Sequence, residues 1–244
     1  MNPRNTVHSN RTMMFAELAR VMNHGEKSGS YRNSMHENIF NKATSVSAIK
    51  TTKLLIRLYD FDETLPCFKA FRHFWNISNE SGKPIIALLY ALSRDYLLAE
   101  SVAVINETKY GEKVSIDAIE SNIELHNPNK YSINTRRSSA QNIASSWKQA
   151  GFITGKVKNI RTLPDINYQV VAFAFLMAYL NGVRGDFILK SNWVKALSLD
   201  EKTIRSLAIE AAKRDLLQYQ FAGNVTSITF THLLKKLNID GFEN

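Results

Sequence analysis

Apolar residues recur at helical spacing along most of the chain, and two stretches are apolar almost throughout. The first, Lys83–Leu98, predicts a central buried helix that continues to Thr108. The second, 166–183, contains no Asp, Glu, Lys or Arg. Its uninterrupted apolar part, Val170–Leu180, is shorter than the roughly 20 residues that a bilayer span requires. We therefore expect a buried core helix there and no membrane association.

The N-terminal part of the chain alternates between polar breaks and short amphipathic segments. Residues 1–11 are polar and predict a disordered tail. The pattern that follows predicts helices at Met13–Met22, at Met35–Lys42 and from about Ser45 to Tyr59, with a polar break after the first. Three helices in this order outline a helix-turn-helix domain.

The third of these predicted helices has a basic outer face, because Lys50, Lys53 and Arg57 lie opposite its apolar positions. These side chains are candidate DNA contacts. An aromatic-rich helix at 62–77 follows, and it completes an expected N-terminal domain of residues 12–78.

The next expected domain, 79–164, carries the sharpest pattern. Helices are predicted at Ser115–Leu125 and Asn134–Ala150, each beginning with a capping residue. Two short strands are predicted at Phe152–Val157 and Ile160–Leu163, around a polar turn. A winged-helix domain has this order of elements, with helices followed by a basic hairpin.

The second helix of this domain is rich in groups that bind nucleic acid. Ile143, Ala144 and Trp147 form its core-facing stripe, and its other faces carry no carboxylate. Arg can pair with guanine, Gln or Asn with adenine, and Ser or Thr with phosphate. The candidate DNA contacts on this helix are Thr135, Arg136, Arg137, Ser138, Gln141, Asn142, Ser145 and Lys148. Those on the hairpin are Lys156, Lys158 and Arg161.

The C-terminal part, 165–244, repeats this order as a second expected winged-helix domain. Helices are predicted at Tyr168–Asn181, Ser191–Leu197, Asp200–Arg214 and Thr231–Ile239, and strands at Leu216–Ala222 and Val225–Phe230. Lys202 and Arg205 are candidate DNA contacts, but Glu201 and Glu210 lie beside them, so protein contact is an equal alternative. The predicted fold is mainly α, with tandem helix-turn-helix and winged-helix units that carry short β-hairpin wings.

Charge is distributed unevenly along the chain. The net charge is +9, and residues 127–164 carry seven basic and no acidic residues, including Lys130. Nucleic acid is the commonest partner of such a stretch, because basic side chains neutralise phosphates and release counterions. A basic surface that is merely soluble, or one that docks an acidic protein, is the alternative.

Motifs of catalysis are scarce. The single cysteine, Cys67, cannot form an internal disulfide, and the six histidines lack metal-ligand spacing. No phosphate-binding glycine loop or G-x-S-x-G motif occurs. We read the acidic cluster at 60–63 as the region that begins a helix. The expectation is a cytoplasmic protein that is not an enzyme and has no cofactor or metal.

Part of the chain resembles a known family. The runs PIIALLYALSRDYLL (84–98), SIDAIESNI (115–123) and TRRSSAQNIASSWKQAGFI (135–153) are similar to the BrxA family of bacterial BREX phage-defence systems, or to a related winged-helix family of defence islands. The resemblance covers about 83–153 and has no counterpart from Asn167 onward. It implies double-stranded DNA binding without catalysis, contacts from Arg136, Arg137 and the 156–161 hairpin, and other defence-system subunits as partners.

Several functions share these features. A DNA-binding subunit of a defence or DNA-processing assembly is the first expectation. A winged-helix transcriptional regulator would in addition form a dimer that prefers a palindromic site. A protein-interaction scaffold without nucleic acid and an RNA-binding protein remain alternatives.

Overall fold

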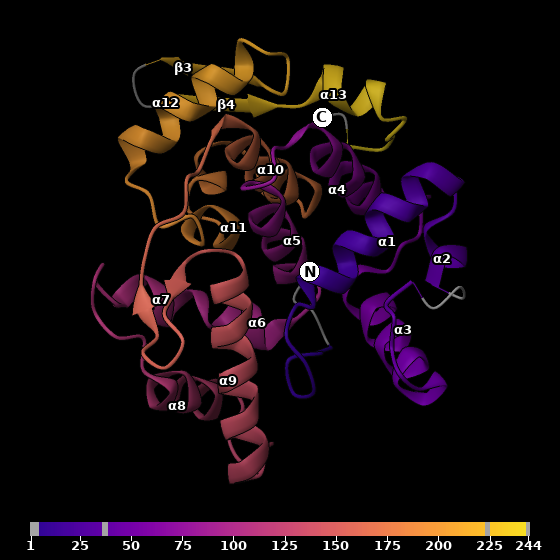
Figure 1. The fold of residues 1–244 in the computed structure, drawn as a ribbon. Coiled ribbons are helices and arrows are strands. Elements are labelled where there is room, and N and C mark those ends of the chain that lie inside the picture. The colour runs from indigo at the N-terminus through magenta and orange to yellow at the C-terminus, as the bar shows by residue number, and fades with distance from the viewer. Residues whose placement is uncertain (1–4, 36–38, 223–224, 243–244) are drawn as a thin grey trace.

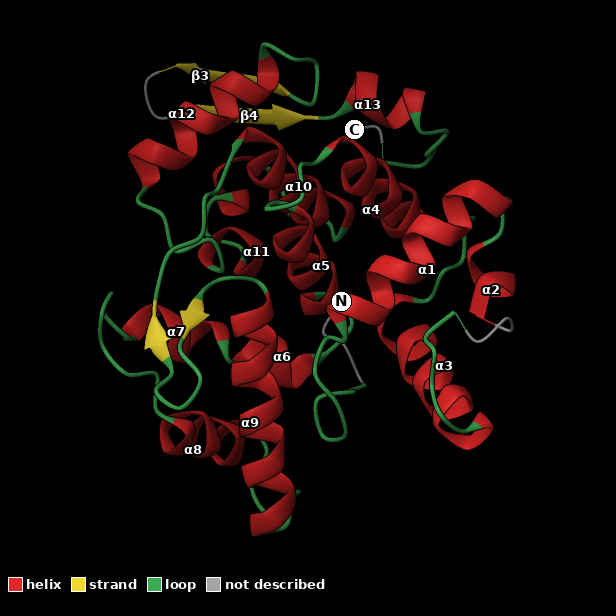
Figure 2. Cartoon of the chain, viewed as in Figure 1, coloured by secondary structure: helices red, strands yellow, loops and turns green. Residues whose placement is uncertain are grey.

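The computed structural model describes residues 5–35, 39–222 and 225–242. Within them the protein is mainly helical, with two small antiparallel hairpins, as the sequence predicts (Figures 1 and 2). Helices α5 and α10 lie in the middle of the molecule, α8 and α9 at one end, and α12 with the β3–β4 hairpin at the other (Figure 1).

The N-terminal segment is packed rather than disordered. Val7 and His8 are almost completely buried, so the prediction of a disordered tail is wrong for residues 5–11. Residues 1–4 lie outside the described part. This segment supplies apolar and hydrogen-bonding side chains to the core. Its mostly polar composition does not indicate that role.

The first helices begin and end differently from the prediction. Helix α1 continues through Gly25, which the pattern reads as part of a break. A Cβ atom at Gly25 would lie 2.4 Å from Tyr31, so glycine is required there by close packing. The short second helix lies before Met35, and residues 36–38 are outside the described part. The elements are α1 (Phe15–Ser28), α2 (Tyr31–Ser34), α3 (Ser45–Tyr59) and α4 (Pro66–Ile77).

The long apolar helix predicted over 83–108 is divided into three. Asp95 is fully buried and caps the second piece by accepting from Leu98 N at 3.2 Å. A buried carboxylate that satisfies helix N–H groups interrupts the helix although the apolar pattern continues. The pieces are α5 (Lys83–Leu92), α6 (Tyr96–Glu100) and α7 (Val102–Glu107).

The central unit follows the predicted order. Ser115 caps α8 as expected, whereas the capping residue of α9 is Ser132, two residues before the predicted cap Asn134. Lys113 forms an isolated antiparallel bridge with Ile160, so the chain before α8 lies against the second strand of the hairpin. The elements are α8 (Ile116–His126), α9 (Ile133–Gln149), β1 (Ile153–Thr154) and β2 (Ile160–Arg161).

The C-terminal unit also has the predicted order, and Asp200 caps α12. Every residue of Val170–Leu180 is buried. No helix among the described residues has both the length and the apolar character that crossing a membrane requires. The predicted turn at residues 223–224 lies outside the described residues. The elements are α10 (Tyr168–Leu180), η2 (Gly185–Ile188), α11 (Asn192–Lys195), α12 (Glu201–Ala212), β3 (Gln218–Ala222), β4 (Val225–Thr229) and α13 (Thr231–Lys236).

One hydrophobic core runs through the molecule, from Val7 to Ile239. It crosses the borders expected near residues 78 and 164. Gln169 donates to the Ile77 carbonyl at 2.7 Å, and the indole of Trp193 donates to the Leu89 carbonyl at 3.1 Å. The three expected units therefore share their interior and are joined by direct hydrogen bonds.

Candidate nucleic-acid interface

Helix α9 is anchored on one side and open on the other. Ile143 and Trp147 are fully buried, and the Trp147 indole donates to Ser101 Oγ at 2.8 Å. Trp147 also packs edge-to-face on Phe152, with ring centroids 5.2 Å apart. These contacts fix the helix and determine which of its faces meets solvent.

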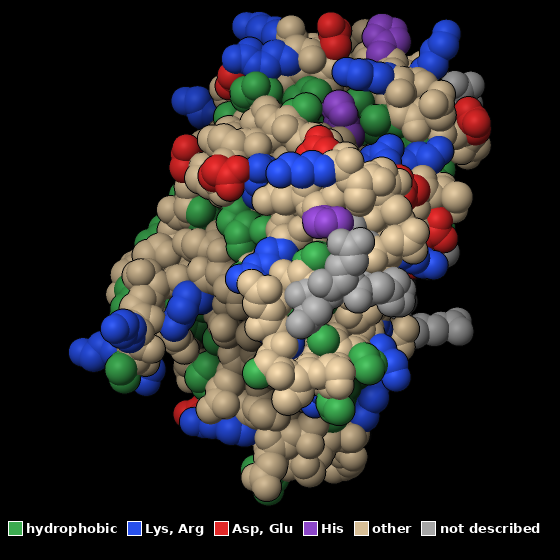
Figure 3. All heavy atoms as spheres, turned by 45° about the vertical axis from the view of Figure 1, so that its right-hand side comes forward, with side chains coloured by type: hydrophobic (Ala, Val, Ile, Leu, Met, Phe, Trp, Pro, Cys, Tyr) green, Lys and Arg blue, Asp and Glu red, His purple; other side chains and the backbone are tan. Residues whose placement is uncertain are grey.

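Beyond Ile133 at its start, which is 72% exposed, the open side of α9 carries polar and basic groups. Asn134 and Gln141 are exposed, and Ser138, Ser145 and Lys148 are partly exposed. Their spacing of three or four residues places them along one side of the helix. Figure 3 shows most of the visible acidic side chains in the upper half of the surface, while Lys and Arg are found in both halves. We call Asn134, Ser138, Gln141, Ser145 and Lys148 the open face of α9.

The β1–β2 hairpin extends this basic surface. Lys156 and Lys158 are exposed at its tip, and Val157 between them is 91% exposed. Gly155 has φ +92°, and a Cβ atom there would lie 2.3 Å from the Lys158 carbonyl oxygen. Only glycine fits such a turn. Lys148 Nζ donates to the Gly155 carbonyl at 2.7 Å, which joins the hairpin to α9.

Arg136 and Arg137 are engaged within the protein, contrary to the expected carboxylate-free surface. Arg136 pairs with Glu124, and Arg137 Nη1 lies 2.5 Å from both Asp117 and Glu120. Hydrogen bonds to Glu120 and Asp117 raise the pKa of Arg137. The acids come from α8, which is distant in sequence but packs against α9. Both arginines therefore join the two helices, although the side chain of Arg137 remains 49% exposed.

Arg161 is buried, whereas the sequence predicts it to be a DNA contact. Only 1% of it is exposed, and it donates to the carbonyls of Ile105 and Phe152 at 3.1 Å each. It also donates to Ser198 Oγ at 2.6 Å. Burial lowers the pKa of this guanidinium. Its place in the second strand turns the side chain inward, so it cannot contact DNA in this structure.

Three further candidates on or near α9 have internal partners. Thr135 belongs to the cap of the helix, where its Oγ1 lies 2.9 Å from Ser132 Oγ. Asn142 donates to the His8 carbonyl at 2.9 Å, which directs it toward the N-terminal segment. Lys130 Nζ lies 4.5 Å from the ring centroid of Tyr96.

The candidates outside the central unit divide into exposed and engaged residues. On α3, Lys50, Lys53 and Arg57 are exposed along one face. On α12, Lys202 is exposed, but Arg205 Nη1 donates to Tyr219 Oη at 2.8 Å and its guanidinium pairs with Glu201 and Asp186. Arg205 thus holds α12 to β3 and to η2.

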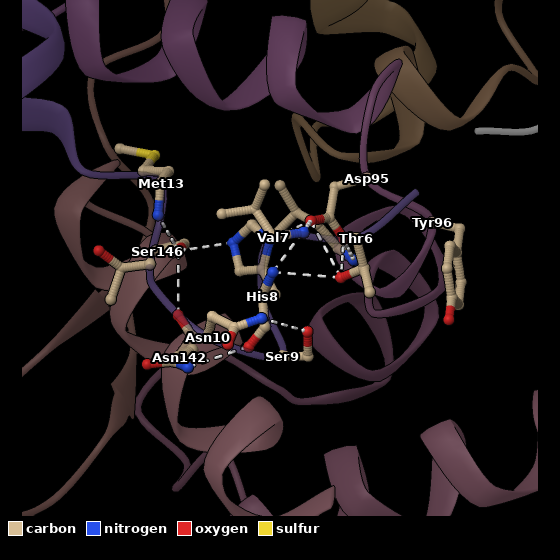
Figure 4. A network of polar contacts seen from close by, with 12 residues as sticks. Thr6, Val7, His8, Ser9, Asn10, Met13, Asp95, Tyr96, Asn142 and Ser146 are labelled. Carbon is tan, nitrogen blue, oxygen red and sulfur yellow. Dashed lines mark hydrogen bonds and ion pairs between the residues drawn. The ribbon is translucent and has the colours of Figure 1, made fainter. Parts of the chain in front are cut away.

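Sequence reasoning missed a buried polar network beside α9 (Figure 4). His8 Nδ1 lies 2.8 Å from Asp95 Oδ2, and His8 Nε2 lies 2.9 Å from Ser146 Oγ. Burial alone raises the pKa of Asp95, but His8 and the hydrogen bonds from Val7 N and Leu98 N together leave it below its usual value. The signals in the sequence were a histidine in a polar terminus and an aspartate inside an apolar run, and neither suggests a partner.

A Ser, His and Asp in this order occur in hydrolases. Here all three side chains are fully buried. Ser146 Oγ in addition donates to the Asn142 carbonyl and accepts from Met13 N, at 2.9 and 2.8 Å. A substrate could not reach this oxygen without opening the core, so the network acts as a structural link between the N-terminal segment, α6 and α9. Among the described residues, no group of three or more His, Cys, Asp or Glu could hold a metal ion.

No protein-family model, curated protein or solved structure matches this chain.

Proposed function

We propose that the protein binds double-stranded DNA through a winged-helix unit formed by residues 102–163. The support is the order α7, an extended segment, α8, α9, β1 and β2, with the extended segment paired to the hairpin. Besides the Lys113–Ile160 bridge, Val114 N donates to the Asn159 carbonyl at 2.7 Å. In such units the third helix enters the major groove.

The proposal rests on the charge of one surface, formed by the open face of α9 and the neighbouring hairpin tip. This surface contains Lys148, Lys156 and Lys158 and no carboxylate. Gln141 suits an adenine edge, and Ser145 suits a phosphate. The lysines at the hairpin tip would neutralise phosphates of the adjacent backbone. This set of contacts is smaller than the sequence suggests, because Arg136, Arg137 and Arg161 are engaged elsewhere.

The role as a cytoplasmic subunit of a phage-defence or DNA-processing assembly rests on the sequence resemblance alone. A dimer that prefers one palindromic sequence would instead identify a transcriptional regulator. Both roles use the same face of α9.

A protein-interaction scaffold is the second candidate, and α3 favours it. Val46 and Ile49 are 75% and 55% exposed on the face that carries Lys50 and Lys53. A mixed apolar and basic helix face suits an acidic protein partner better than a phosphate backbone.

The test places two negative charges on the open face of α9. Fluorescence anisotropy with an unrelated DNA duplex is compared for the native chain and the Gln141→Glu/Ser145→Glu variant. We expect the variant to bind about tenfold more weakly or worse, because carboxylates would face phosphates. The control variant Asn23→Glu/Asn76→Glu adds the same charge at exposed positions of α1 and α4 and should bind as the native chain does. Equal loss in both variants, or in neither, would contradict the proposed face.

A further inference from the structure

A cavity of about 750 Å³ lies between α6–α7, the end of α8 with its following loop, and α11. Its size is within the range of small-molecule sites. The open face of α9 does not line it. The residues that give it chemical character are Tyr96, Glu100, His126, Asn127, Lys130 and Lys195.

One carboxyl group, that of Glu100, lines the cavity, and Lys130 and His126 act on it electrostatically without a close ion pair. Glu100 Oε2 accepts from Asn127 Nδ2 at 2.9 Å, and among the described residues Glu100 forms no ion pair. Burial raises the pKa of this carboxyl. A half-buried carboxylate in this position is suited to accept a hydrogen bond from a ligand, because no described residue donates a hydrogen bond to its Oε1 atom.

The rim is basic. Lys130 and Lys195 form no ion pair with any described residue. His126 Nδ1 lies 2.9 Å from the Asn122 carbonyl, so the neutral ring donates through Nδ1 and keeps Nε2 as an acceptor. Two lysines against one carboxylate favour a ligand with negative charge. Tyr96 and Val102 add the apolar surface that such sites usually have.

We infer that this cavity binds a small organic anion of nucleotide size. The lysines Lys130 and Lys195 hold its anionic group, and Glu100 with Asn127 accepts and donates hydrogen bonds at its polar ring or amide edge. A nucleoside monophosphate is the simplest molecule with all of these features. The inference does not depend on DNA binding, since neither the open face of α9 nor the hairpin tip takes part.

The cavity lies between the central unit and the C-terminal unit. It is lined by the loop that leads into α9 and by α11 of the C-terminal unit. Asn106, in its wall, donates to the Lys195 carbonyl at 2.9 Å and accepts from Ser198. A bound anion would therefore add a second link between the two units at the point where they already meet.

The experiment is isothermal titration calorimetry of the full chain with adenosine, guanosine, cytidine and uridine monophosphates, and with adenosine and inorganic phosphate separately. We expect saturable binding of at least one monophosphate, and binding about tenfold weaker or worse for the nucleoside and for phosphate alone. Lys195→Ala should weaken the monophosphate about tenfold or more, because its exposed side chain supplies charge and no fold contact.

Two controls keep the result decisive. Lys213→Ala removes an exposed lysine of the other end of the molecule and should leave binding unchanged, as should Gln141→Glu/Ser145→Glu. Absence of binding by all four monophosphates at about 1 mM, or equal binding of phosphate alone, would overturn the inference. Unchanged binding in Lys195→Ala would overturn it as well. Because Gln141→Glu/Ser145→Glu alters the proposed DNA-binding face and not the cavity, its effect on monophosphate binding distinguishes the two sites.

Discussion

Arg161 is a basic residue in the strongly basic stretch of the chain, yet its side chain belongs to the core. Its guanidinium donates hydrogen bonds to the backbone carbonyls of Ile105, Phe152 and Thr162 and to Ser198 Oγ. Buried carbonyls that lose their donor cost free energy, and bonds from a charged donor are among the stronger ones. The residue therefore contributes to stability and not to ligand binding.

We expect Arg161→Met to lower the free energy of unfolding by roughly 3 kcal/mol, because the acceptors that it serves, among them the Ile105 carbonyl, lose a charged donor. Urea denaturation followed by circular dichroism measures this. Lys158→Met, on the exposed hairpin tip three residues earlier, is the control and should change stability little. If both substitutions changed the free energy of unfolding by similarly small amounts, the buried hydrogen bonds of Arg161 would not contribute to stability.

Asp95 makes stability depend on pH in a defined direction. Its folded pKa lies below the value of the unfolded chain. The contribution of the carboxylate is therefore fully present above the unfolded pKa of about 3.9 and is lost as the pH falls through the folded value.

The corresponding prediction concerns Asp95→Asn. Near neutral pH we expect it to lower the free energy of unfolding by about 3–5 kcal/mol, because it removes one member of a buried pair. Below about pH 4 the difference from the native chain should shrink as the pH falls from the unfolded pKa of Asp95 through its lower folded pKa. Chemical denaturation at a series of pH values gives the comparison, and a difference that stays constant down to pH values well below about 4 would contradict this role.

At the residue scale, the sequence predicts exposed candidates better than it predicts their partners. Gln141, Ser145, Lys156 and Lys158 lie on the surface as expected. The engagement of Arg137 could not be predicted, because the acids that bind it lie on another helix. Spacing along a chain shows which residues share a face, but not which helix covers that face.

Helix limits were predicted best where a side chain caps the helix. Ser115 caps α8 as expected, and Asp200, the predicted first residue of the next long helix, is the capping residue of α12. The apolar run 83–108 was predicted as one helix, and its division depends on Val7 and His8 of the N-terminal segment, which hydrogen-bond to Asp95. A contact over such a distance leaves no local signal.

The hairpin tip provides a test at the scale of the element. We expect Gly155→Ala to lower the free energy of unfolding by about 1–3 kcal/mol and to weaken DNA binding, because it combines a positive φ with a close backbone contact. Gly111→Ala is the matched control. Gly111 has φ +82° but nothing within 4 Å of an added Cβ atom, so only the smaller conformational cost applies.

Thermal unfolding and DNA titrations of the two variants separate these contributions. A larger loss in Gly111→Ala than in Gly155→Ala would contradict the described turn.

The whole molecule is held together by α10, which was predicted to belong to the C-terminal unit only. Phe173 is fully buried and lies 5.3 Å from Phe74 and 6.4 Å from Phe71, measured between ring centroids. Both partners belong to α4 of the expected N-terminal domain. Patterns along the sequence suggest three units, but they do not show that the units share one core.

We therefore expect one cooperative unfolding transition. Trp75, Trp147 and Trp193 lie in the three expected units, one in each. Fluorescence of variants that retain a single tryptophan should report the same midpoint as circular dichroism. Phe173→Ala should lower the free energy of unfolding by about 3–5 kcal/mol and shift all three signals together. Separate midpoints for the three tryptophans would contradict a shared core.

We propose that the open face of α9 and the hairpin tip bind the phosphate backbone of duplex DNA. The most direct measurement is the affinity for an unrelated duplex over a series of salt concentrations. Binding should weaken steeply with salt, and Lys156→Ala/Lys158→Ala should reduce the slope of log affinity against log salt by about 2. Lys235→Ala/Lys236→Ala, on α13, removes the same charge and should leave the slope unchanged. Binding that is absent at low salt, or a slope that falls equally in both variants, would contradict the account.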